Sequence, residues 1–209
     1  MKLHISAFDH GSPIPDEYAM FNIAEEGHVT PGGNRNPEIR WANVPEGTKS
    51  LALIVIDTDA PTVGDDVNQE GRTVPEDLPR TDFHHWVLVD IDPGLERIEK
   101  GSASDGVTAG GKPTGETEHG VTGQNDYTGW FSGDEEMGGI YGGYDGPAPP
   151  WNDARIHNYT FRLYALDVDS LGLTGSFDAG KALEAMEGHV IATADHVGRY
   201  SLNPSVRNW

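Results

Sequence analysis

Leu51-Ala-Leu-Ile-Val-Ile56, followed directly by Asp57-Thr-Asp-Ala-Pro61, is the stretch that decides the fold of this chain. Six consecutive apolar residues between turn residues are too few for a typical helix and match a strand buried on both faces. The end of this strand carries two carboxylates, Asp57 and Asp59, which point to the same side of an extended chain. The stretch therefore predicts a buried β-strand with acidic groups at its C-terminal end.

Strand patterns also surround this stretch. Four further segments are rich in β-branched and aromatic residues, in several places at period two. They are Lys2 to Phe8, Glu38 to Val44, Phe83 to Ile91 and His157 to Leu166. Polar stretches rich in glycine and proline interrupt them, above all a long loop insertion around residues 101–145. Loops of that length in a compact domain are often functional.

Helical spacing occurs only near the C-terminus. The spacing of apolar residues predicts a helix from Asp178 to Met186, with Asp178 as N-cap or first-turn acid and Gly188 as the residue that ends it. The helical pattern is repeated from Val190 to Val197. The fold class is thus mainly β, an antiparallel β-sandwich with short C-terminal helices. We expect residues 1–209 to form a single domain.

The charge balance excludes several classes of function. The chain has 34 acidic and 14 basic residues and a net charge of -20, so it lacks the basic footprint that nucleic acid needs, and anionic membranes should repel it. Five Trp, seven Tyr and six Phe indicate a packed core and not a disordered acidic chain. The acidity suggests a halophilic source, in which salt screens self-repulsion, and predicts unfolding at low salt.

Location follows from what the sequence lacks. It has no cysteine, no apolar signal sequence at its start and no apolar run near the ~20 residues that span a bilayer. We expect a cytoplasmic protein that is not embedded in a membrane.

Three local motifs could carry chemistry, although each also has a structural interpretation. The Asp57–Asp59 pair could share a proton, bind a cation or orient a histidine, or simply form a turn. His84 and His85 point to opposite faces of a strand, so only one can face a site. Gly146-Pro-Ala-Pro-Pro150, shortly before His157, could form a rigid pocket wall or an exposed polyproline turn.

Taken together, the motifs resemble the phosphatidylethanolamine-binding protein family, in its Raf-kinase-inhibitor-like bacterial and archaeal branch. The resemblance rests on segments that occur in the family's order over nearly the whole chain. They are Asn36-Pro-Glu-Ile-Arg-Trp41, the stretch from Val44 to Pro61, Phe83-His-His-Trp86, Gly146-Pro-Ala-Pro-Pro150, His157-Asn-Tyr-Thr-Phe161, Leu163-Tyr-Ala-Leu-Asp167, and Gly188 to Tyr200. Asn36, Thr58 and Asn158 depart from the residues usual in the family, and the loop before Gly146 is longer than typical.

The resemblance implies a large sheet packed against a smaller one, with a small cavity that binds phosphate-like and carboxylate-like anions, including phospholipid head groups. Carried over by motif, the cavity wall should consist of Asp57, Asp59, Pro61, His85, Ala148, Pro149, His157 and Tyr159. It also implies that the second histidine of the pair faces the cavity, that a kinase or another protein is regulated, and that the chain forms a homodimer.

Because the net charge opposes anions, local donors such as imidazole N–H groups and the Tyr159 hydroxyl must hold the ligand. Asp57 could raise the pKa of His85 or His157 and keep it a donor, so we expect weaker anion binding above pH ~7. The alternative is a metal-dependent or carboxylate/histidine hydrolase that uses Asp57, Asp59, His85 and His157. Since no nucleophile or metalloenzyme motif is present, a binding protein without cofactor or metal is favoured over an enzyme.

Overall fold

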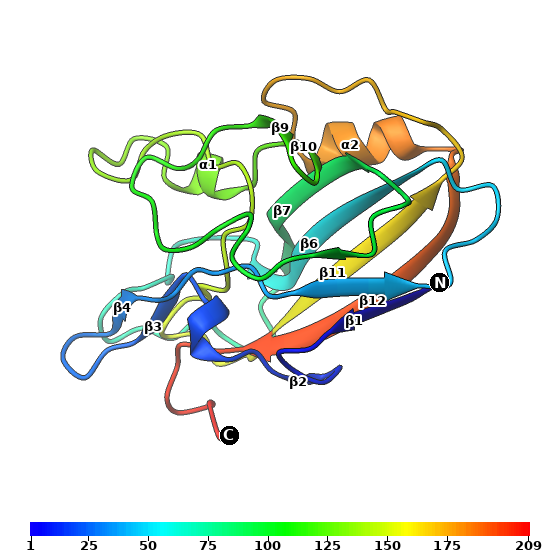
Figure 1. Ribbon diagram of the computed structural model, residues 1–209. Coiled ribbons are helices and arrows are strands. Elements are labelled where there is room, and N and C mark those ends of the chain that lie inside the picture. Colours follow the sequence, from blue (N-terminus) through cyan, green and yellow to red (C-terminus); the bar gives the residue numbers. More distant parts are fainter.

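The computed structural model describes all residues from Met1 to Trp209. Its centre is a seven-stranded sheet with the strand order β2-β12-β11-β6-β7-β10-β9 (Figure 1). The sheet consists of β2 (Ser12–Pro13), β6 (Ser50–Pro61), β7 (Arg80–Ile91), β9 (Gly115–Thr117), β10 (Gly120–Thr122), β11 (His157–Leu166) and β12 (Val190–Tyr200). All neighbours are antiparallel except β2 and β12, so the large sheet is mixed at one edge.

Two smaller sheets accompany it. A three-stranded sheet has the order β1-β5-β8, and β3 pairs with β4 in a separate hairpin. These strands are β1 (Lys2–Ile5), β5 (Ile39–Ala42), β8 (Arg97–Ile98), β3 (Phe21–Ile23) and β4 (Val29–Pro31). Helices are few and short: the 3-10 helix η1 (Asp16–Tyr18), α1 (Tyr127–Trp130) and α2 (Ala179–Met186). No helix has both the length and the apolar character needed to cross a bilayer.

Strand β6 is buried on both faces, as its apolar run predicts. Leu51, Leu53 and Val55 pack into the core shared with the β1-β5-β8 sheet, which also holds Trp86 and Phe161. Their alternates Ala52, Ile54 and Ile56 face a second core beneath α2. Period-two alternation thus distributes one continuous apolar run between two layers, which confirms the predicted β-sandwich.

One element was predicted wrongly. Val190 to Val197 lies in β12 and not in a helix, and β12 pairs with β11 from His157 to Leu166. The segment carries the β-branched residues Val190, Ile191, Thr193 and Val197. Such residues favour strands, and the partner β11 supplies the hydrogen-bond ladder that sequence spacing alone cannot reveal.

Helix α2 has the N-cap that the sequence predicts. The side chain of Asp178 accepts a hydrogen bond of 2.9 Å from the backbone N–H of Lys181. We expect Asp178→Ala to lower the free energy of unfolding by about 1 kcal/mol, because an unsatisfied helix N-terminus would replace this bond. Urea unfolding of both proteins would measure it, and Asp178→Asn, which can still cap, should lose much less.

The insertion at residues 101–145 is folded and not an open loop. It contains β9, β10 and α1 and ends at Asp145, which is fully buried. The Asp145 carboxylate accepts hydrogen bonds from Asn34 (2.8 Å) and Asn125 (2.8 Å) and pairs with Lys112 at 2.5 Å. The bond from Asn34 ties the insertion to the segment that precedes β5, and α1 lies over the end of the central strands (Figure 1).

Candidate functional site

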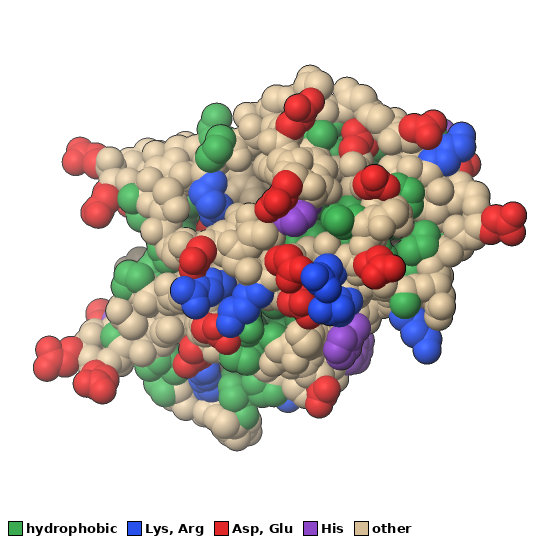
Figure 2. Space-filling view, in the orientation of Figure 1, with side chains coloured by type: hydrophobic (Ala, Val, Ile, Leu, Met, Phe, Trp, Pro, Cys, Tyr) green, Lys and Arg blue, Asp and Glu red, His purple; other side chains and the backbone are tan.

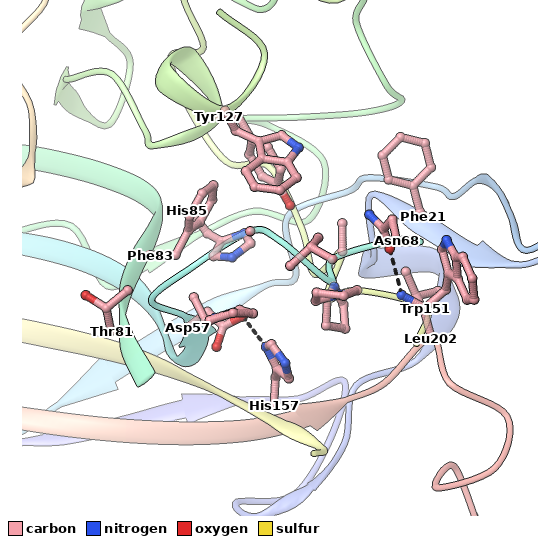
Figure 3. A pocket seen from close by; sticks show the side chains of 18 of the residues that line it. Phe21, Asp57, Asn68, Thr81, Phe83, His85, Tyr127, Trp151, His157 and Leu202 are labelled. Atoms are coloured by element: carbon pink, nitrogen blue, oxygen red, sulfur yellow. Dashed lines mark hydrogen bonds and ion pairs between the residues drawn. The ribbon is translucent and has the colours of Figure 1, made fainter. Parts of the chain in front are cut away.

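A cavity of about 490 Å³ lies where β6, β7 and β11 meet the folded insertion (Figure 3). Its polar base is formed by Asp57 of β6, His85 of β7 and His157 at the start of β11, all of which are buried. Its outer wall is apolar and largely aromatic, with Phe21, Phe83, Tyr127, Phe131, Trp151 and Leu202. No lysine or arginine lines it.

Most of the predicted site residues lie together in this cavity. Asp57, Pro61, His85, Ala148, Pro149 and His157 line it. Tyr159 lies just behind the wall, 99% buried, with its ring centroid 5.2 Å from that of His85. Its hydroxyl has no hydrogen-bond partner.

Asp59 does not share the cavity with Asp57. The register between β6 and β7 shifts between Asp57 and Ala60, which breaks the strict alternation of the strand. The Asp59 carboxylate instead pairs with Arg155 at 3.0 Å and accepts two hydrogen bonds from Asn158, at 2.9 and 2.8 Å. The hydrogen bonds of Asp59 therefore hold the start of β11 in place beside the cavity.

The two adjacent histidines separate as strand alternation requires. His84 points away from the cavity, and its Nδ1 lies 2.9 Å from the carboxylate of Asp126. His85 lies in the cavity wall, where its Nδ1 is 2.8 Å from the backbone carbonyl of Asp145. Because a carbonyl only accepts, Nδ1 carries the proton, and in the neutral ring Nε2 is a bare acceptor. Nε2 is buried without a partner, and burial lowers the pKa of His85 more than Asp57 raises it.

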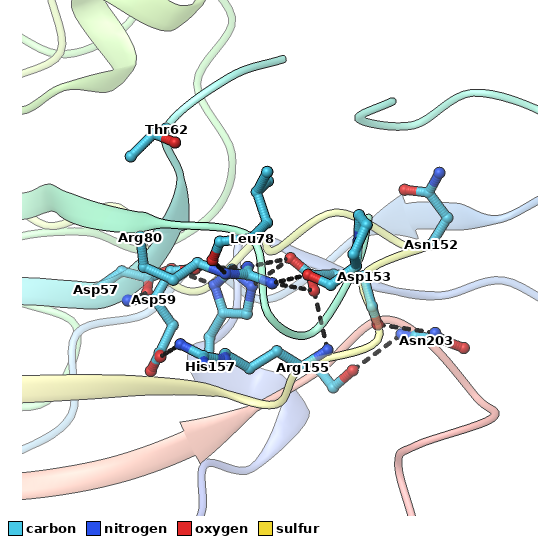
Figure 4. Close-up of polar contacts among 12 residues, drawn as sticks. Asp57, Asp59, Thr62, Leu78, Arg80, Asn152, Asp153, Arg155, His157 and Asn203 are labelled. Atoms are coloured by element: carbon cyan, nitrogen blue, oxygen red, sulfur yellow. Dashed lines mark hydrogen bonds and ion pairs between the residues drawn. The ribbon is translucent and has the colours of Figure 1, made fainter. Parts of the chain in front are cut away.

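His157 has the opposite environment. Its Nδ1 lies 2.7 Å from Asp57 and its Nε2 lies 3.0 Å from Asp153, so both ring nitrogens face carboxylates (Figure 4). Burial alone would lower the pKa of His157, but the two carboxylates outweigh it and raise the pKa to about 9. His157 is therefore a buried imidazolium whose two N–H donors are both in use.

Asp153 joins this imidazolium to a second buried cation, Arg80. The two side chains form a bidentate pair at 2.6 and 3.0 Å, and the remaining guanidinium donors bond to the carbonyls of Asp59, Leu78 and Pro75. The network Asp57–His157–Asp153–Arg80 holds two negative and two positive charges, so it is close to neutral. Sequence reasoning missed Arg80 and Asp153, since neither stands in a motif that marks a site.

The tandem-proline segment forms one wall through a close approach of backbones. Gly146 packs against Tyr18 so tightly that a Cβ atom would lie 2.0 Å from the Tyr18 carbonyl oxygen. Its N–H donates a bond of 2.7 Å to the side chain of Asn34. Only glycine fits this position, and it sets the course of the chain into Ala148 and Pro149.

The residues considered for a metal site do not converge. Asp59 is turned aside, and both nitrogens of His157 already face carboxylates. No group of three His, Asp or Glu side chains in the 209 residues is arranged to hold a metal ion. The cavity thus offers a single buried nitrogen without a partner, Nε2 of His85.

Comparison with known proteins agrees with the motifs and the fold. The family model described as phosphatidylethanolamine-binding protein matches residues 4–201. The chain belongs to the phosphatidylethanolamine-binding protein family. A relative named UPF0098 protein from Methanothermobacter thermautotrophicus is 30% identical over 200 residues, which cover 96% of this chain and 98% of the relative. The UPF0098 protein YbcL of Escherichia coli is 28% identical over 172 residues, 82% of this chain and 74% of the relative.

Solved structures of this family share the architecture. The crystal structure of Escherichia coli YbcL, described as a member of the mammalian family, superposes with a TM-score of 0.68 at 23% identity, over 96% of this chain and 97% of that one. A phosphatidylethanolamine-binding protein homolog from Chlamydia trachomatis gives 0.62 at 28% identity, over 96% of both chains. The fold predicted from the motifs is therefore confirmed.

Proposed function

We propose that this protein binds small ligands that carry a phosphate or carboxylate group, with the anionic head at His85 and the remainder against the aromatic wall. The observation that carries the proposal is the Nε2 atom of His85, which is buried in the cavity wall without a partner. A buried polar atom without a partner costs free energy that a ligand can recover.

A chain of charge -20 can hold an anion here because the base of the cavity is itself balanced. The charges of Asp57 and Asp153 are offset by those of His157 and Arg80. Close, buried pairs are screened little by solvent and dominate the local field. The bulk acidity then acts mainly on the approach of the ligand.

Anion binding at this site should be coupled to a proton. The donors of His157 are already committed to carboxylates, and neutral His85 presents an acceptor. Either His85 takes up a proton at Nε2 or the ligand arrives in its acid form. In both cases one proton enters the complex, and affinity falls as the pH rises above the pKa of free His85.

Calorimetric titration with acetate would test this coupling, because acetate does not itself titrate near neutral pH. We expect uptake of close to one proton per acetate, seen as a change in the measured heat of binding with the ionisation enthalpy of the buffer. We also expect the affinity for acetate to fall about tenfold per pH unit between about pH 7 and about pH 8.5. His85→Gln, whose amide can donate without a proton, should bind with no pH dependence. His84→Gln, outside the cavity, should behave as the wild type.

Flat wild-type affinity between about pH 6 and about pH 8.5, without proton uptake, would contradict the proposal. So would an unchanged pH dependence in folded His85→Gln. Five further expectations from the sequence stay predictions. They are regulation of a kinase or another protein, a homodimeric state, a cytoplasmic location, a halophilic origin and the absence of enzymatic activity.

A further inference from the structure

The mouth of the cavity is bordered by exposed apolar side chains from three separate segments. Trp130 at the end of α1 is 54% exposed, Val63 after β6 is 51% exposed, and Val29 at the start of β4 is 38% exposed. All three line the cavity. Single exposed apolar residues need no explanation, but three around one opening, continuous with an aromatic wall, mark an interaction surface.

The rim is held in place before any partner arrives. His28, in the β3–β4 hairpin, stacks on Trp151 with ring centroids 3.5 Å apart and an interplanar angle of 3°. The same imidazole lies 2.5 Å from Glu70, in the segment between β6 and β7. Two of the three rim segments are thus tied together at the opening, which lowers the ordering cost of binding there.

The rim segments also carry a strongly one-sided charge. Residues 21–34, 62–79 and 127–141 contain ten acidic residues and one basic residue, Arg72. Arg72 is already paired with Asp66 at 2.6 Å. Exposed carboxylates stand close in the sequence to each apolar rim residue: Glu25 and Glu26 before Val29, Asp65 after Val63, and Glu135 and Glu136 after Trp130. Figure 2 shows acidic side chains at the tips of the two lobes at the left of the view.

This combination selects among possible occupants. An anionic membrane would be repelled by the acidic rim, and a second copy of this chain would present the same acidic rim to it. A segment with an apolar anchor and lysine or arginine on either side fits both features. The anchor would fill the apolar mouth, and the flanking cations would face carboxylates and the exposed ring of Trp130.

We propose that the mouth of the cavity is a docking surface for a basic segment of another protein, anchored by one aromatic or aliphatic side chain. The inference does not depend on what occupies the polar base. It predicts that tight binding requires both the apolar anchor and the basic residues of the segment. The contribution of the basic residues to affinity should fall as the salt concentration rises, because their ion pairs with the rim carboxylates would be exposed to solvent.

The probe is an acetylated and amidated peptide, Lys-Lys-Phe-Lys-Lys, titrated by tryptophan fluorescence and by calorimetry in a buffer in which circular dichroism shows the protein folded. We expect binding that is lost with Glu-Glu-Phe-Glu-Glu and weakened about tenfold with Lys-Lys-Ala-Lys-Lys. Phosphatidylcholine vesicles containing phosphatidylserine should not bind.

Matched charge reversals test the location. Glu26→Lys with Glu135→Lys should weaken the peptide about tenfold. Asp169→Lys with Glu184→Lys makes the same change in net charge at exposed positions away from the cavity and should have little effect. Equal losses from both pairs, equal binding of the acidic peptide, or binding of the vesicles in preference to the basic peptide would each overturn the proposal.

Discussion

Replacing Asp153 with alanine is expected to lower the free energy of unfolding by about 3–5 kcal/mol. Asp153 is fully buried and contacts two cations, Arg80 at 2.6 Å and His157 at 3.0 Å. The substitution would leave a guanidinium and one imidazolium N–H inside the protein without a counter-charge. The cost comes from these stranded charges, since an intact buried pair itself contributes little net stability.

Urea unfolding at constant pH and salt would measure this loss. Asp66→Ala is the matched control, because it removes a carboxylate from Arg72 at the same distance of 2.6 Å but at the surface. That variant should lose no more than about 1 kcal/mol. Similar losses in the two variants would show that burial of the Asp153 network is not what makes it costly to break.

The strands could be predicted where one pattern dominates the sequence. His157–Leu166 has the predicted bounds in the structure, and the apolar run of β6 marks the strand that is buried on both faces. Such patterns report burial directly, because period two and apolar runs follow from which faces contact a core. β12 was predicted wrongly because its inner residues, His196, Gly198 and Tyr200, are not a typical apolar face.

The cavity residues could be found only partly, and for a physical reason. Asp57, His85 and His157 stand in recognisable motifs. Arg80 and Asp153 do not. They are 73 residues apart in the sequence, and only the folded chain brings the guanidinium to the carboxylate. Asp59 is turned aside by a register shift, which no alternation rule foresees.

The charge states of the two cavity histidines likewise depend on tertiary contacts. A neighbouring Asp57 was expected to raise the pKa of either one. In the structure, the raised pKa belongs to His157, which has two carboxylate partners. His85 has one partner, the backbone carbonyl at its Nδ1, and its Nε2 has none. One imidazole is therefore paired on both sides within the fold, and the other keeps one nitrogen without a partner.

The stability of the protein is expected to fall by about 3 kcal/mol as the pH rises from about 6.5 to above 9, because His157 loses its proton in this range. Its pKa is about 9 in the folded protein against 6.5 as a reference. Since the folded state binds this proton more tightly than the unfolded state, the contribution is complete below pH 6.5 and disappears as the pH passes through about 9. The pKa values of Asp57 and Asp153 are lowered, so their contributions disappear only in acid.

Denaturant unfolding at a series of pH values would reveal this slope, and a variant locates it. His157→Gln can still donate an amide N–H but carries no titrating charge, so its stability should be lower at pH 6.5 and nearly constant up to pH 9, apart from the other groups that titrate in both proteins. His189 provides a comparison at the surface. Its Nδ1 lies 2.8 Å from the carboxylate of Asp167, but its side chain is 44% exposed. His189→Gln should keep the full wild-type slope. A wild-type slope that survives in His157→Gln would assign the pH dependence to other groups and show that the buried imidazolium does not carry it.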